Sequence, residues 1–193
     1  MINYTAKLDK AIRRSAWAHE QAGQHRKGTD LPYIIHPFGT MLIASNATKN
    51  EDILIACLLH DILEDINPKI YGESEIESEF GSKILSIVKD VTNNNNPNWY
   101  QKSEAYLNHI AAKACNEAIV VCISDKIHNL SSVLYDFEII GDKIWQRFST
   151  KNAKDQVWWY QSVLEVTKKR GAPKVLVNQL EALIEKLLTK VSI

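Results

Sequence analysis

Hydrophobic residues recur with the spacing of an α-helix along most of the chain. In the first such stretch, Leu8, Ile12, Ala16 and His19 fall on one side of a helix that Gly23 ends. No segment alternates hydrophobic and polar residues for long enough to predict a strand, and no repeat of roughly 20–50 residues is visible. The pattern therefore predicts an all-α protein.

Breaks in the pattern divide the rest of the chain. A polar loop at 25–32 leads into a short extended stretch at 33–36, and Pro37 suits the first position of the next helix. The stretch at 51–66 contains no Gly or Pro, which predicts one long helix. Further helices are predicted at 74–80, 82–91, 99–114, 117–130, 132–137, 143–148, 152–169 and 173–191. No connecting loop is long enough to be a linker, so we expect one domain over residues 1–193.

The composition is typical of a soluble globular protein. Of the 193 residues, 45% are hydrophobic and 24% charged, and the formal net charge is zero, so nothing global favours nucleic acid or an anionic membrane as partner. The N-terminal segment lacks the apolar core of a signal peptide, and no apolar run approaches the ~20 residues of a membrane span. Cys57, Cys115 and Cys122 show no CxxC spacing, which favours reduced core cysteines of a cytoplasmic protein over a disulfide or a thiolate site.

Four ionisable residues stand inside the apolar stretch ILIACLLHDILED. At helical spacing, His60 lies beside Glu64 and Asp61 beside Asp65. Three carboxylates that close together would repel one another and resist desolvation. A bound cation is the simplest way to hold them, so the pattern indicates a metal site.

Two further residues are candidates for the same site. His36 precedes a proline at a helix start, and Asp125 follows a mostly apolar run, where a carboxylate needs a partner. Together with His60 and Asp61 they would supply two nitrogen and two oxygen ligands. Such a set suits Mn²⁺, Fe²⁺ or Zn²⁺, and the share of oxygen favours Mn²⁺.

Each residue taken alone also has a simpler explanation. His36 could cap a helix, and Asp125 could pair with Lys126 or His128. Glu64 and Asp65 could be solvated residues at a helix end. The combination of all these residues within apolar helices is what favours a metal centre.

The motifs resemble those of the HD-domain hydrolases of the RelA/SpoT type, specifically the stand-alone small alarmone hydrolases. The matching stretches are AHEQAGQHRKGTDLPYIIHP (18–37), IACLLHDILED (55–65), FGSKILSIVKDVT (80–92), KSEAYLNHI (102–110), ISDKIHNL (123–130) and WQRF (145–148). They follow the order of that family and cover about residues 15–165. The resemblance implies a single HD-domain helical bundle.

The same resemblance implies an activity and a site. The activity is Mn²⁺-dependent hydrolysis of guanosine tetra- and pentaphosphate at the 3′ position, releasing pyrophosphate and GDP or GTP. The implied metal ligands are His36, His60, Asp61 and Asp125. The implied catalytic residues are Glu64 and Asp65, which position or activate the attacking water. The implied substrate-binding residues are Arg26, Lys27, Tyr33, Lys102, Asn129, Ser132 and Arg147.

Several alternatives remain open at this level. Gln101 replaces an arginine that is common in relatives, and the asparagine run at 93–98 is an unusual connection. Another nucleotide phosphoester, such as the 2′-phosphate of NADPH, would use the same site, and a non-catalytic nucleotide sensor is the third reading. A toxic alarmone synthetase is a possible indirect counterpart. The aromatic cluster at 158–160 suits either the core or an interface.

Overall fold

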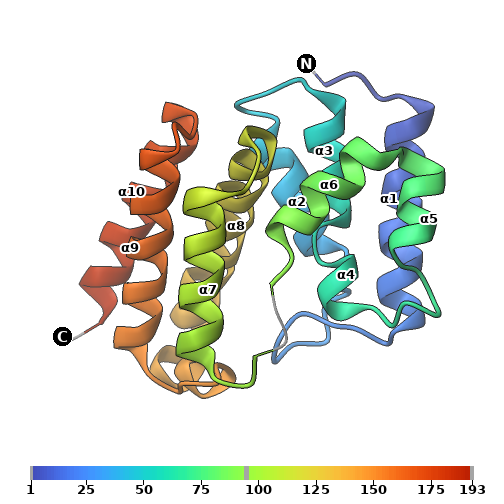
Figure 1. Ribbon diagram of the computed structural model, residues 1–193. Coiled ribbons are helices and arrows are strands. Elements are labelled where there is room, and N and C mark those ends of the chain that lie inside the picture. Colours follow the sequence, from blue (N-terminus) through green and yellow to red (C-terminus); the bar gives the residue numbers. More distant parts are fainter. Residues whose placement is uncertain (1, 94–95, 192–193) are drawn as a thin grey trace.

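Helices make up nearly all the regular structure of the protein (Figure 1). The computed structural model describes residues 2–93 and 96–191, and within these ranges the one β-type pairing is a bridge between His25 and Pro32. The elements are α1 (Ala6–Gln21), α2 (Ile35–Ala44), α3 (Glu51–Leu59), α4 (Ile62–Asp65), α5 (Glu73–Phe80), α6 (Ser82–Val91), α7 (Trp99–Ala112), α8 (Asn116–Ile140), the 3-10 helix η1 (Gly141–Arg147), α9 (Ala153–Lys169) and α10 (Lys174–Lys190). The predicted all-α fold is confirmed, whereas the extent of one domain over residues 1–193 stays a prediction.

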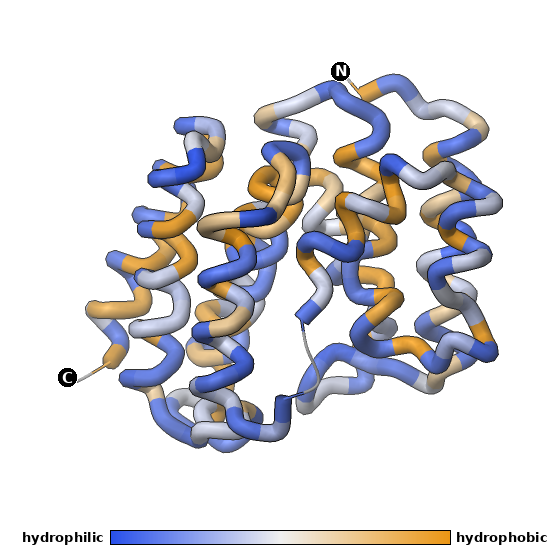
Figure 2. Tube along the Cα trace, in the orientation of Figure 1, coloured by the Kyte–Doolittle hydropathy of each residue, from blue (hydrophilic) through white to orange (hydrophobic). Residues whose placement is uncertain are grey.

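Helix α3 lies at the centre of the hydrophobic core. Every residue from Ile53 to Leu59 is buried, and α3 packs against α1, α2, α6 and α8. A helix that is hydrophobic on all sides is stable only when its neighbours cover it completely. Figure 2 shows hydrophobic positions interleaved with hydrophilic ones along the helices of the bundle. The turn at His60 and Asp61, which directly follows α3, is therefore held next to the core.

Side chains at the helix starts satisfy amides that have no partner inside the helix. Thr5, before α1, accepts a hydrogen bond at 3.0 Å from the amide three residues further on, and Asn98 does the same for α7 at 3.1 Å. Asn98 is the last residue of the predicted asparagine loop at 93–98. Residues 94 and 95 of that loop lie outside the described residues.

The long helix predicted at 51–66 is interrupted. Helix α3 ends at Leu59, a turn follows at His60 and Asp61, and α4 resumes at Ile62. The ring Nδ1 of His60 bonds to the carbonyl of Cys57 at 2.8 Å. In a continuing helix, that carbonyl would accept a hydrogen bond from the amide of Asp61. The side chain of His60 therefore takes the place of one backbone hydrogen bond of the helix.

The prediction of an extended stretch at 33–36 is wrong. Tyr33 and Ile34 form a turn, and α2 begins at Ile35, ahead of Pro37. The amide of His36 donates to the carbonyl of Tyr33 at 2.9 Å, which closes the turn. Proline is tolerated in this first turn because the amide it lacks would have had no helical partner.

Helix α8 is continuous where two helices were predicted. It runs through the paired serines at 131–132, and the hydroxyl of Ser132 donates to the carbonyl of His128 at 3.0 Å. Serine is thus accommodated inside the helix by bonding back to the preceding turn. The helix predicted at 143–148 is the 3-10 helix η1.

The three cysteines are free thiols. Cys57 and Cys122 are buried and Cys115 is partly buried. Burial raises the pKa of Cys122 to about 11, so this thiol is protonated at neutral pH. Cys57 and Cys122 lie in the core as predicted, whereas Cys115 packs only against its edge.

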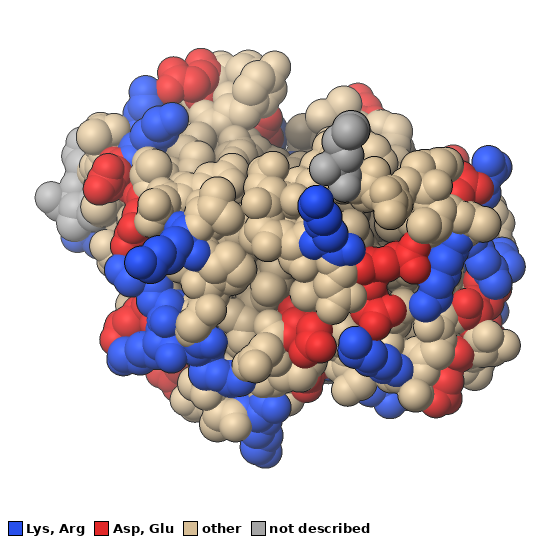
Figure 3. Space-filling model, turned by 90° about the horizontal axis from the view of Figure 1, so that it is seen from above, with Lys and Arg blue, Asp and Glu red and all other residues tan. Residues whose placement is uncertain are grey.

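Charges of both signs are mixed on the surface. Figure 3 shows the end of the bundle that is uppermost in Figure 1, where basic and acidic side chains are interspersed. Among the described residues, no helix combines the length and the apolar character needed to cross a membrane. The loop that follows α1 and the 3-10 helix η1 lie at the opposite end of the bundle, which is lowest in Figure 1.

Candidate active site

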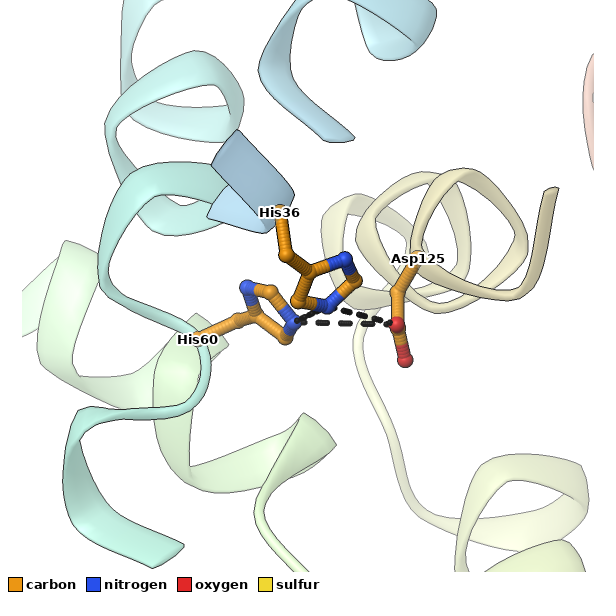
Figure 4. A group of neighbouring side chains, drawn as sticks. All are labelled: His36, His60 and Asp125. Carbon is orange, nitrogen blue, oxygen red and sulfur yellow. Dashed lines mark hydrogen bonds and ion pairs between the residues drawn. The ribbon is translucent and has the colours of Figure 1, made fainter. Parts of the chain in front are cut away.

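Three helices bring three ligand-type side chains to one point. His36 comes from the start of α2, His60 from the end of α3 and Asp125 from the middle of α8 (Figure 4). The two histidine Nε2 atoms are 3.1 Å apart, and Asp125 Oδ1 lies 3.2 Å from His36 Nε2 and 3.7 Å from His60 Nε2. All three side chains are buried. Their ligand atoms lie within 4.8 Å of one another, which is a spacing that one metal ion can bridge.

Asp61 adds a fourth donor to this point. Its Oδ2 lies 3.3 Å from His36 Nε2 and 3.1 Å from His60 Nε2. Consecutive residues of a regular helix point about 100° apart. The turn at His60 and Asp61 removes that constraint and allows both side chains to face the same point. The structure thus brings all four predicted ligands together, and their binding of a metal stays a prediction.

The chemistry of this donor set fits a divalent cation. When His60 is neutral, its bond to the Cys57 carbonyl keeps the proton on Nδ1, so that Nε2 offers a lone pair to the centre. Burial alone would lower the pKa of His60, but the charges of Asp61 and Asp125 raise it well above its usual value. Burial alone would likewise raise the pKa of Asp125, yet Lys126 and the two histidines hold it well below its usual range. The centre therefore attracts positive charge, and two imidazoles with two carboxylates suit Mn²⁺, Fe²⁺ or Zn²⁺.

Neighbouring side chains hold the two carboxylates in place. Lys126 donates to Asp125 Oδ2, and the amide of Asn129 donates to Asp125 Oδ1. The hydroxyl of Tyr33 donates to Asp61 Oδ2 at 2.8 Å. The pairing of Asp125 with Lys126 therefore exists beside its contacts with the histidines and does not replace them. Such outer partners fix the orientation of metal ligands.

Beside this centre lies a cleft of about 890 Å³. Its walls come from the loop that follows α1, from α4, the start of α7, α8, η1 and α9. All the predicted substrate-binding residues line it: Arg26, Lys27, Tyr33, Lys102, Asn129, Ser132 and Arg147. Gln101 does not line the cleft, and its side chain accepts a hydrogen bond from Asn96 at 3.1 Å.

The two carboxylates of α4 face this cleft. Glu64 pairs with Lys102 at 2.7 Å and accepts the amide of Asn93 at 3.2 Å. Asp65 accepts a hydrogen bond from the side-chain amide of Gln24 at 2.7 Å. The surrounding cleft wall and the negative charge of Asp61 raise the pKa of Asp65 to about 6.

Comparison with known proteins assigns the family. The HD domain matches residues 11–135, which is well over half of the chain. The chain belongs to the HD domain family. Together with the relatives described next, this match confirms the resemblance seen in the motifs.

Similar proteins include animal and bacterial members of this family. The chain is 29% identical to the Xenopus tropicalis protein named guanosine-3′,5′-bis(diphosphate) 3′-pyrophosphohydrolase MESH1 over 184 residues, 94% of each chain, and 30% identical to the Danio rerio MESH1 over 65% of this chain and 68% of that one. An Aquifex aeolicus guanosine-3′,5′-bis(diphosphate) 3′-pyrophosphohydrolase is 28% identical over 69% of this chain, which spans only 19% of that longer protein.

Solved structures share the fold. One, described as a metazoan ortholog of SpoT that hydrolyzes ppGpp, superposes with a TM-score of 0.78 at 22% identity and covers 96% of this chain and 98% of its own. A Listeria monocytogenes protein superposes with a TM-score of 0.68 at 23% identity over 80% of this chain and 99% of its own. At these identities the likeness supports the HD-domain fold alone.

Arg26 of this HD domain is held against the cleft wall. Its Nη2 donates to Asn129 at 3.0 Å, and its guanidinium lies 5.5 Å above the ring of Tyr33. The loop around it also approaches η1 closely, since a Cβ on Gly28 would lie 2.4 Å from the Nε of Arg147. Arg147 in turn pairs with Asp136 at 2.5 Å. The basic loop, residues 25–32, thus packs against α8 and η1.

Three supporting residues of the HD site were missed at the sequence level. Gln24 joins His19 Nδ1, at 2.6 Å, to the carboxylate of Asp65. Lys126 was considered only as an alternative partner of Asp125. Gly39 was not considered at all, although it makes room for His128. A glycine inside a helix is the one local signal that marked such a close approach.

Gly39 and His128 together support His36. The ring Nδ1 of His128 shares a hydrogen bond with His36 Nδ1 at 3.0 Å. Burial and the neighbouring His36 lower the pKa of His128 to about 4, so its neutral ring can accept that bond. A Cβ on Gly39 would lie only 2.1 Å from Cδ2 and 2.3 Å from Nε2 of His128. Only glycine therefore allows the ring to lie against α2.

Gly39→Ala is expected to weaken metal binding about tenfold or more, because His128 must move away from His36, and outer partners of metal ligands typically contribute 10–100-fold in affinity. Calorimetric titration with Mn²⁺ measures the effect. Alanine in a helix interior would by itself stabilise the fold by about 0.5–1 kcal/mol relative to glycine. A variant with higher thermal stability and unchanged Mn²⁺ affinity would contradict this account.

Proposed function

We propose that this HD domain is a Mn²⁺-dependent guanosine-3′,5′-bis(diphosphate) 3′-pyrophosphohydrolase, which converts guanosine tetra- or pentaphosphate into GDP or GTP and pyrophosphate. The observation that carries the proposal is the convergence of two histidines and two aspartates beside a cleft lined by basic residues. The alignment with proteins named for this activity over nearly the whole chain supports it.

The four ligands would hold the cation at the edge of the cleft. His36, His60, Asp61 and Asp125 are its proposed ligands, with Mn²⁺ favoured by the two carboxylates. When bound, a divalent cation supplies Lewis acidity, which neutralises charge on a phosphoryl group and makes a nearby water easier to deprotonate.

The α4 carboxylates are the proposed proton acceptors. Glu64 lies beyond the His-Asp turn, faces the cleft and is held by Lys102 at 2.7 Å. A general base must lie within hydrogen-bond reach of the attacking water, and the carboxylate of Glu64 is open to water that enters the cleft. Asp65, with its pKa raised to about 6, is suited to pass the proton on near neutral pH.

The basic loop is the proposed nucleotide-binding element. Arg26 presents a planar guanidinium, which can cover a purine ring as well as pair with phosphate oxygens. Lys27 lies 5.5 Å over the ring of Phe148 and faces the same cleft. The substrate carries a diphosphate at each end, so these charges offset its repulsion from the carboxylates of the metal centre.

Arg26→Ala is expected to raise KM for guanosine tetraphosphate about 10–100-fold and to change kcat no more than a few-fold. Stacking and charge pairing with the nucleoside act equally on the bound substrate and the transition state, and such uniform binding appears in KM. Steady-state kinetics at saturating Mn²⁺ separates the two constants. Arg13→Ala, on the exposed face of α1, is the matched control. A loss confined to kcat would argue against nucleotide binding by Arg26.

The direct test is hydrolysis of guanosine tetraphosphate by metal-stripped protein with and without added Mn²⁺, with products separated by ion exchange. GDP and pyrophosphate that form only with Mn²⁺ support both the reaction and the metal. If guanosine tetraphosphate stays intact and phosphate is released from NADPH, the substrate is another nucleotide phosphoester. If neither is cleaved by Mn²⁺-loaded protein, the hypothesis of a non-catalytic nucleotide sensor replaces that of an enzyme.

The proposed function also implies a cytoplasmic location, with an alarmone synthetase as the indirect counterpart of this protein.

A further inference from the structure

Helices α7 and α9 place three buried polar side chains on one wall of the cleft. Ser103, Gln156 and Tyr160 are 4%, 4% and 3% exposed. Among the described residues, no hydrogen bond involves the Ser103 hydroxyl, the Gln156 amide or the Tyr160 hydroxyl. Each of these groups can therefore form a hydrogen bond with a molecule in the cleft.

These groups differ from polar atoms that are closed off inside the protein. The closed-off atoms without a partner, among the described residues, are Ser15 Oγ, His19 Nε2, Thr40 Oγ1, Ser124 Oγ and Thr150 Oγ1. The polar atoms of Ser103, Gln156 and Tyr160 do not belong to that set, because they open onto the cleft. They therefore remain accessible to a molecule that enters it.

The cleft beside this wall is lined by basic side chains and by three carboxylates: Arg26, Lys27, Lys102, Lys126, Arg147, Glu64, Asp65 and Asp136. Lys126 lies 5.5 Å from the ring of Trp159 and 5.4 Å from that of Tyr106, directly beside the carboxylate of Asp125. Tyr160 packs into the hydrophobic core and also lines the cleft that holds these basic residues.

We propose that Ser103, Gln156 and Tyr160 form a wall of neutral hydrogen-bond donors that binds phosphate oxygens of the substrate. This inference rests on the proposed function. Two hydroxyls and one amide can each donate to a phosphate oxygen. The phosphates in question are the diphosphate that leaves from the 3′ position or the diphosphate that remains at the 5′ position. Donors without charge bind these oxygens in addition to the lysines, without adding positive charge that would repel the cation.

The test compares three ligands on full-length protein loaded with Mn²⁺: pyrophosphate, GDP and guanosine, each titrated by calorimetry. Tyr160→Phe removes one oxygen, and Gln156→Leu and Ser103→Ala remove the other donors. Loss of one neutral hydrogen bond is expected to weaken phosphate binding about tenfold. Tyr100→Phe, at a tyrosine that is 51% exposed and outside the cleft, is the matched control and should leave all three affinities unchanged.

Each outcome decides the inference. Weaker binding of pyrophosphate alone assigns the wall to the leaving diphosphate, and weaker binding of GDP alone assigns it to the 5′ diphosphate. Unchanged affinity for both, equal weakening of guanosine, or no binding of either phosphate ligand by the unsubstituted protein overturns it. Tyr160→Phe keeps the test valid if the other variants fail to fold. The titrations measure binding without turnover. If the variants weaken phosphate binding as expected but the protein does not hydrolyse guanosine tetraphosphate, only the proposed function is contradicted.

Discussion

Asp61→Asn is expected to lower the affinity for Mn²⁺ at least about 100-fold and to abolish turnover at micromolar metal. Asparagine has nearly the same shape but supplies no negative charge to the centre shared with His36 and His60, whose Nε2 atoms lie within 3.3 Å of Asp61 Oδ2. Even outer partners of metal ligands contribute 10–100-fold, so a direct ligand should contribute at least as much. Calorimetric titration of metal-stripped protein with Mn²⁺, followed by assay of guanosine tetraphosphate hydrolysis, measures both effects.

The matched control for this variant is Asp30→Asn, at an exposed aspartate that does not line the cleft. It removes the same charge from the chain and should leave Mn²⁺ affinity and turnover unchanged. Circular dichroism should show that both variants remain helical. Normal Mn²⁺ binding by Asp61→Asn would refute the assignment of Asp61 as a ligand.

Glu64→Gln is expected to lower kcat by about 10²–10⁴-fold while Mn²⁺ affinity stays within a few-fold of its original value. Glutamine keeps the size of the side chain and can still accept from Lys102 and from the amide of Asn93, but it cannot take a proton from water. Single-turnover kinetics with saturating Mn²⁺ separates this loss from any change in substrate binding.

Glu77→Gln on the exposed face of α5 makes the same chemical change away from the cleft and should leave kcat as it was. An unchanged kcat in Glu64→Gln would remove Glu64 from the mechanism. A loss that appears only as weaker Mn²⁺ binding would instead make Glu64 part of the metal centre.

Helix positions could be predicted from the sequence because they depend on local spacing. The apolar run 53–59 is continuous, which predicts a buried helix, and α3 is buried on all sides. Gly81 separates two helices as predicted, since it takes a φ of 96° that other residues rarely adopt. These features require no knowledge of what lies next to them in space.

Two of the errors arose where a side chain competes with the backbone for a hydrogen bond. His60 takes the carbonyl of Cys57 and interrupts a helix that contains no breaking residue. Ser132 does the opposite, because its hydroxyl bonds to the carbonyl of His128 and lets α8 continue through a pair of serines. Residue type alone does not say which of these two bonds forms.

The sequence by itself determined the all-α class, the order of the helices and the residue types of a metal centre. Only the tertiary structure decided that His36, His60 and Asp125, far apart along the chain, have ligand atoms within 4.8 Å of one another. It alone placed His128 against Gly39 and opened Ser103, Gln156 and Tyr160 onto the cleft. The physical reason is that helical periodicity records which face of each helix is buried, whereas the packing of α2, α3, α7, α8 and α9 decides which buried faces meet.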